Sequence, residues 1–200
     1  MIKVVGLDLS TCTGLAVIVS GGIKPSVHHT EVVQFKKLNG WPRVNAIACR
    51  IMEVVEQEEP DCVALEGYGF GQMASVVTLA EIGSVVRFLL WQEDIPFLDI
   101  PPSSLKKFVT GKGNAKKDQM ILEVYKHYGY TSKTNDIADA IGLGMFGLCA
   151  MGVKFPAGPT KCVNDVLKSD KNLVNFAPAT KFKQSVQLIA KDLAKPENLL

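Results

Sequence analysis

The chain has 200 residues and a mass of 21.7 kDa, which fits one domain or one domain with an appendage. With 47% hydrophobic and 21% charged residues, it can bury a core, and this excludes a mostly disordered chain. The formal net charge is +2, from 22 Lys and Arg against 20 Asp and Glu; this excludes a protein coated with basic charge, although nucleic-acid binding stays open because it needs a local patch.

The cysteine pattern and the hydropathy of the chain indicate its compartment. Five cysteines are widely spaced and none forms a C-x-x-C pair, so we expect free thiols in a reducing compartment rather than disulfides or a cysteine-based zinc site. Asp8 interrupts the apolar N-terminal run, and Asp139 interrupts the most apolar later stretch, residues 137–155. We therefore expect no signal peptide, no membrane-spanning helix and a soluble, cytoplasmic protein.

The first third of the chain predicts three strands followed by a helix. Short apolar runs indicate the strands, at residues 2–9, 15–20 and 30–36. Turn residues between the first two runs predict a hairpin. Apolar residues then recur at helical spacing from Pro42 to Glu58, and Pro60 ends that helix.

From residue 62 onward, strands alternate with helices. The predicted strands are 62–66 and 97–100, and the predicted helices are 73–92, 103–109, 115–128 and 135–150. Asn135 is the expected N-cap of the last of these helices. The residues expected to face inward from helix 73–92 are Val77, Ala80, Val85, Phe88 and Leu89. This order of elements predicts an α/β fold with a mixed sheet.

The composition changes beyond Phe155. Prolines punctuate a polar tail in which lysines outnumber acidic residues eight to four from residue 153 to residue 200. We therefore assign residues 1–152 to one domain and residues 153–200 to a Lys-rich C-terminal extension. Four apolar residues of the extension share one helical face, which predicts a docked or partner-binding helix. They are Phe182, Val186, Ile189 and Leu193.

Four acidic residues lie in apolar surroundings, where an unpaired charge is costly to bury. Asp8 ends the first strand, Glu66 ends the fourth, and Asp136 and Asp139 share one face of the last core helix. Ligands of open α/β sheets bind beyond the carboxyl ends of the strands. If the first and fourth strands are neighbours, Asp8 and Glu66 meet there, and a late helix crossing that edge brings the other two carboxylates to the same point.

Clustered carboxylates raise one another's pKa unless a cation neutralises them. Oxygen ligands with no His or Cys expected nearby favour Mg²⁺, with Mn²⁺ able to substitute, over zinc. The chemistry that best uses such a cluster is two-metal phosphoryl transfer. Each residue also has a structural alternative when it is taken singly: Asp8 as a turn residue, Glu66 as a partner of a lysine, and Asp136 as a helix cap.

A basic segment and a glycine-rich loop are the candidate nucleic-acid contacts. Residues 101–117 carry five lysines and no acidic residue, which suits a phosphate backbone, although a solvated loop is the alternative. Tyr68 and Phe70 follow Glu66 between glycines, where aromatic rings either stack on bases or cover the core. The lysines are Lys106, Lys107, Lys112, Lys116 and Lys117.

Four segments together resemble the RuvC-type Holliday junction resolvases: VVGLDLSTCTGLAV, VALEGYGFG, IPPSSLKKFVTGKGNAKKDQM and NDIADAIGLG. The resemblance covers residues 1 to 152 and implies an RNase H-like nuclease domain, built on a mixed five-stranded sheet flanked by helices. It implies a homodimeric, Mg²⁺-dependent endonuclease that nicks two strands of a four-way DNA junction and leaves 5′-phosphate and 3′-hydroxyl ends.

The same resemblance implies roles for particular residues. Asp8, Glu66, Asp136 and Asp139 correspond to the metal ligands and catalytic residues. Lys106 and Lys117 match the basic loop of the family, and Tyr68 or Phe70 matches its junction-contacting aromatic residue. The apolar helix 73–92 is expected to contribute to the dimer interface as well as to the core.

Two departures from the bacterial pattern bear on specificity. Leu9 and Ser10 stand where many bacterial members have Pro-Gly, and the extension has no counterpart in the typical bacterial enzyme; both features resemble divergent phage or organellar members. A broader debranching nuclease acting on forks, flaps, Y-junctions or RNA–DNA hybrids is therefore an alternative. A second alternative is an ATP-binding domain of the actin and sugar-kinase type, which DLSTCTG suggests, although no second phosphate loop follows. A third alternative is a non-catalytic junction-binding module.

Overall fold

The computed structural model describes residues 1–21, 24–67, 73–154 and 160–168. In that part of the chain five strands form one sheet in the order β3-β2-β1-β4-β5. The N-terminal strands pair antiparallel, whereas β4 runs parallel to both β1 and β5. The mixed five-stranded sheet predicted from the sequence is therefore confirmed. The strands are β1 (Lys3–Asp8), β2 (Thr13–Val19), β3 (Ser26–Val33), β4 (Cys62–Glu66) and β5 (Phe97–Ile100).

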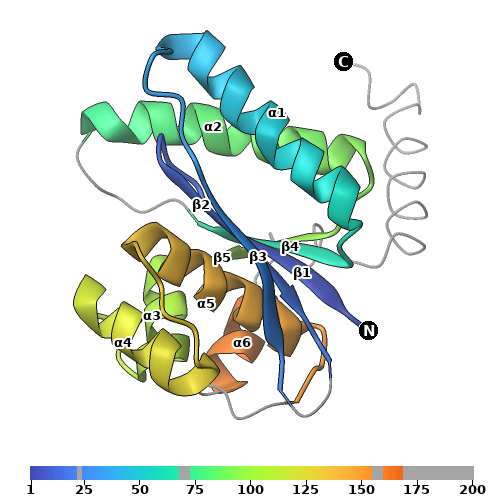
Figure 1. The fold of residues 1–200 in the computed structure, drawn as a ribbon, viewed down its shortest axis with the longest axis vertical. Coiled ribbons are helices and arrows are strands. Elements are labelled where there is room, and N and C mark those ends of the chain that lie inside the picture. Colours follow the sequence, from blue (N-terminus) through green and yellow to red (C-terminus); the bar gives the residue numbers. More distant parts are fainter. Residues whose placement is uncertain (22–23, 68–72, 155–159, 169–200) are drawn as a thin grey trace, which may run out of the picture.

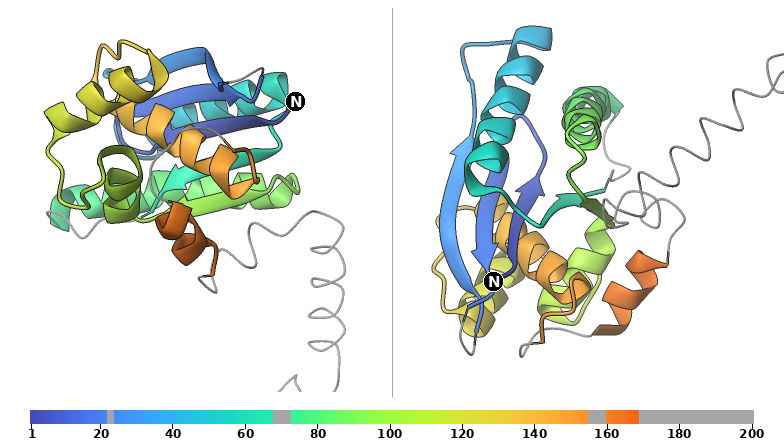
Figure 2. Two further views of the ribbon diagram at one scale, coloured as in Figure 1. Left: turned by 90° about the horizontal axis from the view of Figure 1, so that it is seen from below. Right: turned by 90° about the vertical axis from the view of Figure 1, so that its right-hand side faces the viewer.

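Helices cover both faces of this sheet (Figure 1). On one face α1 and α2 pack over a core that includes Val5, Leu7 and Val86, and on the other face α5 packs over Val4 and Ile18. Figure 2 shows α6 beside α3 and α5 on this second face. The helices are α1 (Gly40–Glu58), α2 (Met73–Gln92), α3 (Pro102–Thr110), α4 (Lys117–Tyr128), α5 (Asn135–Ala150) and α6 (Thr160–Leu167).

The third strand differs most from its predicted bounds of 30–36. Strand β3 begins at Ser26, because it pairs with the whole of β2, from Thr13–Val33 to Val19–Ser26. A bulge opposite Val17 and Ile18 absorbs one extra residue of β3. Polar residues fill this edge strand, so apolar runs are a poor guide to its start.

Two further expectations about helices are wrong. Thr134, rather than Asn135, is the N-cap of α5, and its Oγ1 accepts a hydrogen bond from the Ile137 amide at 3.3 Å. On α2, Val77 and Phe88 are 61% and 58% exposed instead of facing inward. Helix α2 is apolar around much of its circumference, so the sequence does not mark which side is buried.

Two glycines let α5 approach the sheet closely. A Cβ atom on Gly6 would lie 2.0 Å from the Ala140 carbonyl oxygen, and one on Gly14 would lie 2.0 Å from the Asp136 carbonyl oxygen. These contacts fix the first turns of α5 directly over β1 and β2. The start of α5, which carries Asp136 and Asp139, is thereby held at the end of the sheet where β1 terminates.

The described part of the extension adds one helix to the domain. Cys162, Val163 and Val166 of α6 are buried against the same core cluster as α3 and α5. The predicted helical face at Phe182–Leu193, like Tyr68 and Phe70, lies outside the described residues. Among the helices that the structure describes, none is long and apolar enough to cross a membrane.

Candidate active site

Two of the predicted carboxylates end neighbouring strands. Strands β1 and β4 are parallel, and their register pairs Leu7 with Leu65, so Asp8 and Glu66 follow side by side at the same edge of the sheet. A side-chain hydrogen bond joins the two carboxyl groups. The first and fourth strands are therefore neighbours, as the predicted cluster requires.

The other two carboxylates reach this edge from α5. The negative charge of Asp136 acts on Asp8, and the charge of Asp139 acts on Glu66. The charge of Asp8 and, less strongly, the charge of Asp136 raise the pKa of Asp139. The structure thus brings all four predicted carboxylates into one electrostatic cluster.

Burial and mutual repulsion both oppose ionisation of this cluster. Desolvation is the main cause that raises the pKa of Asp8, and the Glu66 charge adds to it. Burial also raises the pKa of Glu66. Burial and the Asp8 charge raise the pKa of Asp139 to about 7. Such perturbed acids at the edge of a sheet are typical of functional sites rather than of ordinary surface carboxylates.

The five predicted lysines separate into two groups. The charges of Lys106 and Lys117 lower the pKa of both Glu66 and Asp139, so these two lysines face the carboxylate cluster. The charge of Lys107 acts on Cys162 of α6, where it opposes the rise in thiol pKa that burial causes. Lys112 and Lys116 are exposed just before α4.

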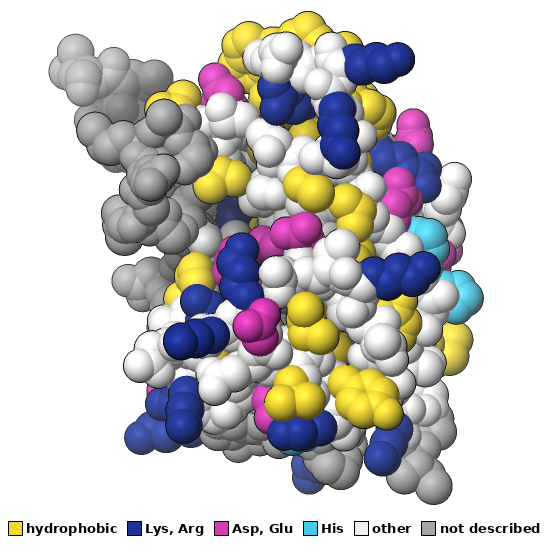
Figure 3. Space-filling model, turned by 60° about the vertical axis from the view of Figure 1, so that its left-hand side comes forward, with side chains coloured by type: hydrophobic (Ala, Val, Ile, Leu, Met, Phe, Trp, Pro, Cys, Tyr) yellow, Lys and Arg dark blue, Asp and Glu magenta, His cyan; other side chains and the backbone are white. Residues whose placement is uncertain are grey.

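The left-hand side of Figure 1, where α3 and α4 lie, comes forward in Figure 3. Acidic side chains lie near the middle of this face, and lysine and arginine side chains lie around them (Figure 3). A basic rim around an acidic centre suits a polyanion whose backbone passes over a cation site.

The donor chemistry of the cluster fits a hard divalent cation. Carboxylate oxygens are the ligands that Mg²⁺ prefers. The two nearby lysines, Lys106 and Lys117, are fewer than the four carboxyl groups and leave part of the negative charge uncompensated. Within residues 1–21, 24–67, 73–154 and 160–168, no three His, Cys, Asp or Glu side chains lie close enough together to coordinate one ion. A hydrogen bond between the Asp8 and Glu66 carboxyl groups requires a proton on one of them.

Sequence reasoning missed Cys12, which lies in the turn after β1. Its Sγ donates a hydrogen bond to Oδ2 of Asp136 at 3.7 Å, so the expectation of no cysteine near the cluster is wrong. The hydrogen bonds of this turn also test the alternative in which Asp8 is only a turn residue. The Ser10 amide donates to Oγ1 of Thr13 at 3.1 Å rather than to Asp8.

Sequence reasoning also missed an ion pair beside Glu66. Arg87 of α2 pairs with Asp99 of β5 and donates to the Glu66 carbonyl oxygen at 3.1 Å. A single acid in the apolar strand FLDI and a single arginine in an apolar helix were the available signals. A small, partly open pocket adjoins this arginine and is lined by Leu9, Glu66 and Gly67 together with residues of α2.

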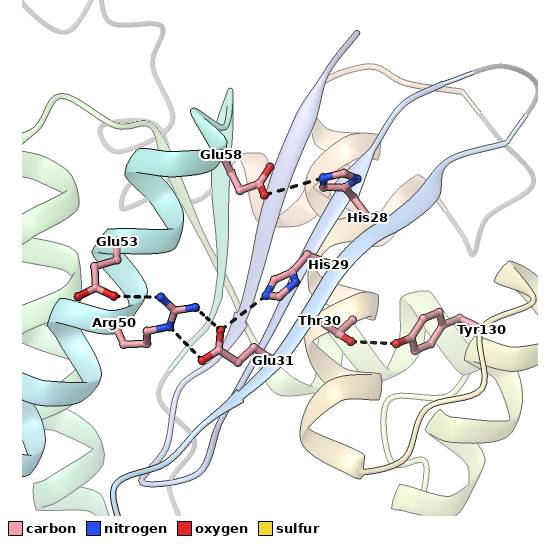
Figure 4. A network of polar contacts seen from close by, with 8 residues as sticks. All are labelled: His28, His29, Thr30, Glu31, Arg50, Glu53, Glu58 and Tyr130. Carbon is pink, nitrogen blue, oxygen red and sulfur yellow. Dashed lines mark hydrogen bonds and ion pairs between the residues drawn. The ribbon is translucent and has the colours of Figure 1, made fainter.

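No role is assigned from the sequence to the three histidines. Two of them, His28 and His29, belong to a separate network between β3 and α1 (Figure 4), whereas His127 lies 3.4 Å from Glu123 on α4. Arg50 forms two hydrogen bonds with Glu31, at 3.0 and 2.8 Å, and His29 lies 3.6 Å from the same carboxylate. His28 lies 3.9 Å from Glu58. This network ties the edge strand β3 to α1, on the opposite side of the sheet from β5.

Three comparisons with known proteins agree with this arrangement. The family model of crossover junction endodeoxyribonuclease RuvC matches residues 4–146. A crossover junction endodeoxyribonuclease RuvC from Carboxydothermus hydrogenoformans is 28% identical over 154 residues, which cover 75% of this chain and 98% of the relative. The structure of T. thermophilus RuvC in complex with a Holliday junction substrate has a TM-score of 0.66 and 26% identity, and the match covers 80% of this chain and 99% of that one.

A more distant structure shares the fold. The fowlpox virus resolvase, solved with substrate Holliday junction DNA, has a TM-score of 0.51 at 14% identity and covers 75% of this chain and 99% of that one. Together with the strand order, the RuvC match confirms the RNase H-like fold expected from the sequence.

Proposed function

Since the chain belongs to the RuvC family of crossover junction endodeoxyribonucleases, we propose that it hydrolyses DNA at the cluster of Asp8, Glu66, Asp136 and Asp139. The family match confirms the prediction of a nuclease that resolves Holliday junctions. It favours this function over the ATP-binding and non-catalytic alternatives. The observation that carries the assignment of the site is the convergence of four half-buried carboxyl groups from β1, β4 and α5.

The RuvC family consists of metal-dependent nucleases, and we propose Mg²⁺ as the ion, with Mn²⁺ able to replace it. The four carboxylates of the cluster would hold it. A bound divalent ion activates water and stabilises the charge on the leaving oxygen. The backbone that carries these carboxylates is fixed at the ends of two neighbouring strands and on the first turns of α5, so side-chain movement alone would bring them together around the ion.

The lysines act on the DNA in two ways. Lys106 and Lys117, whose charges reach the carboxylates, contact the scissile phosphate and offset its negative charge beside the cluster. Lys107, Lys112 and Lys116 contact the flanking backbone, which carries shape rather than sequence information. Tyr68 and Phe70 remain the predicted junction-contacting aromatic residues.

We propose that the enzyme acts on the four-way junction as a homodimer. Helix α2 exposes Val77, Phe88 and Trp91, and the rings of Phe88 and Trp91 stack with centroids 6.3 Å apart. An apolar stripe of this kind on a helix surface suits a self-complementary, twofold interface. A twofold dimer presents one cluster to each of two DNA strands, as paired incision requires.

Cleavage of a defined DNA panel tests this function. With Mg²⁺ the protein should cut a synthetic four-way junction faster than forks, flaps or linear duplex. Asp8→Asn should bind the junction with unchanged affinity and cut it at least about 100-fold more slowly, because a ligand to the ion is lost. Asp165→Asn, an exposed acid on α6, is the control and should cut normally.

Two results would contradict the proposal. Normal cleavage by Asp8→Asn would remove Asp8 from the site. Equal cleavage rates on every branched substrate would favour the debranching alternative. The sequence argument for that alternative is that Leu9 and Ser10 replace the Pro-Gly of many bacterial members.

A further inference from the structure

A buried ion pair joins α2 to β5 behind the catalytic edge. Nε and one terminal nitrogen of Arg87 donate to Oδ1 of Asp99 at 2.8 and 2.5 Å. The two side chains are only 11% and 5% exposed. Asp99 is paired with Leu65 in the β4–β5 ladder, so the pair lies one residue before Glu66.

The same guanidinium reaches the backbone of the catalytic glutamate. One terminal nitrogen of Arg87 donates to the Glu66 carbonyl oxygen at 3.1 Å, and the other donates to the Gly83 carbonyl oxygen at 2.9 Å. On the opposite side of the strand, the Gly67 amide donates to the Ile100 carbonyl oxygen at 2.8 Å. The peptide that follows Glu66 is therefore held from two directions at the point where β4 ends.

The stability of the fold does not explain why this pair of side chains is charged. Taking two charges out of water is costly, and apolar residues of similar volume commonly fill such a place with equal or better stability. An apolar pair cannot donate a hydrogen bond to a carbonyl oxygen, whereas a guanidinium fixed by a carboxylate presents donors in a rigid fork. The feature that requires arginine here is the contact with Glu66.

We propose that Arg87, held by Asp99, is a positioning residue for Glu66. It fixes the backbone from which the Glu66 carboxylate extends toward Asp8 and Asp139, and so sets where that carboxylate meets the ion. The inference rests on the proposed function, because it gives Glu66 its role as a ligand. Partners of metal ligands commonly contribute about 10- to 100-fold to metal affinity or activity.

The test uses variants that keep the volume of the pair. The double variant Arg87→Met with Asp99→Leu removes both charges and the Glu66 contact together, and Arg87→Lys keeps the charge without the fork. Arg50→Met with Glu31→Leu is the matched control, because it removes a two-hydrogen-bond ion pair at the far edge of the sheet. The measurements are the single-turnover cleavage rate on bound junction, the junction affinity in Ca²⁺, and the rise in Tm caused by Mg²⁺ without DNA.

Both Arg87 variants should fold and bind the junction within about twofold of the wild type, yet cut about 10- to 100-fold more slowly and need more Mg²⁺ for the same rise in Tm. The control should cut at the wild-type rate. Folded Arg87 variants with wild-type cleavage and an unchanged Mg²⁺ response overturn the inference, as does a loss of junction binding equal to the loss of cleavage. If the wild type itself does not cut a junction, the proposed function fails instead. Should the double variant not fold, Arg87→Lys alone decides the outcome.

Discussion

Asp139 shows at the scale of one residue how burial prepares the site for a cation. Its carboxyl group lies on α5, where burial and the Asp8 charge raise its pKa to about 7. Lys117 and Lys106 favour the ionised form but do not cancel this rise, so near neutral pH a proton still binds to part of the population.

In the metal-free protein, stability should fall as the pH rises from about 6 to about 8. The folded pKa of Asp139, about 7, lies above the usual 3.8, so the folded state binds more protons than the unfolded chain in this range. Its contribution to stability is full below the unfolded pKa and is lost as the pH rises through about 7. The raised pKa of Asp8 acts in the same direction.

The measurement is Tm in EDTA at both pH values. Asp139→Asn should flatten the dependence, while titrations common to both proteins cancel in the comparison. Mg²⁺ should restore the wild-type Tm at the higher pH. A wild-type Tm that is independent of pH, or an equal slope in Asp139→Asn, would show that the buried carboxyl group is not the cause.

Lys106 and Lys107 are adjacent in sequence and should differ in function. The charge of Lys106 reaches Glu66 and Asp139, whereas that of Lys107 reaches Cys162. Lys106→Met should therefore lower the single-turnover cleavage rate by about 10-fold or more, because a cation beside the scissile phosphate is lost. Lys107→Met should leave that rate within about twofold and weaken junction affinity slightly, with a flatter salt dependence. Equal effects of the two changes on cleavage would contradict this division.

At the scale of elements, the position of α5 depends on the glycines beneath it. Gly14→Ala should destabilise the protein by about 1–3 kcal/mol, because the new Cβ would meet the Asp136 carbonyl oxygen at 2.0 Å. Helix α5 must move away to make room for this Cβ atom. That movement displaces Asp136 and Asp139, so the cleavage rate of the folded fraction should fall as well.

Gly21→Ala is the control for this change, since nothing lies within 4 Å of the added methyl group. Its Tm and cleavage rate should match those of the wild type. Thermal unfolding and cleavage at a temperature where both variants are folded measure the two effects. A Gly14→Ala protein with wild-type Tm would mean that α5 lies farther from β2 than the structure shows.

At the scale of the whole molecule, the exposed apolar side of α2 should decide the oligomeric state. Phe88→Glu should convert the dimer to a monomer, because twofold symmetry places two buried like charges in one interface. The monomer should nick junctions without paired incision. Tyr125→Glu is the matched control, since it alters another exposed ring, on α4.

Light scattering at micromolar concentration measures the mass, and a supercoiled cruciform plasmid separates nicked from linear product. A Phe88→Glu protein that stays dimeric would place the interface elsewhere. Dissociation by Tyr125→Glu would do the same.

Much of the fold follows from local sequence. The bounds of β4, α2 and β5 are those that the sequence predicts, because a short buried run or a helical period is a local property that Gly and Pro interrupt. The carboxylates are predictable for a related reason: Asp8 and Glu66 stand out at the ends of apolar strands. Four motifs in order then make the family recognisable.

The tertiary structure alone decides which of these elements meet. Three features depend on contacts between residues far apart in the chain: β1 lies beside β4, Phe88 faces outward, and Arg87 reaches Glu66. Local sequence patterns do not predict such contacts, because the energy of burying a charge or an apolar face depends on what packs against it. The sequence by itself determined the family and predicted the four carboxylates. The packing of α2 and α5 on the sheet decided how those carboxylates are held, because it supplies the burial, the neighbouring charges and the hydrogen bond to the Glu66 backbone.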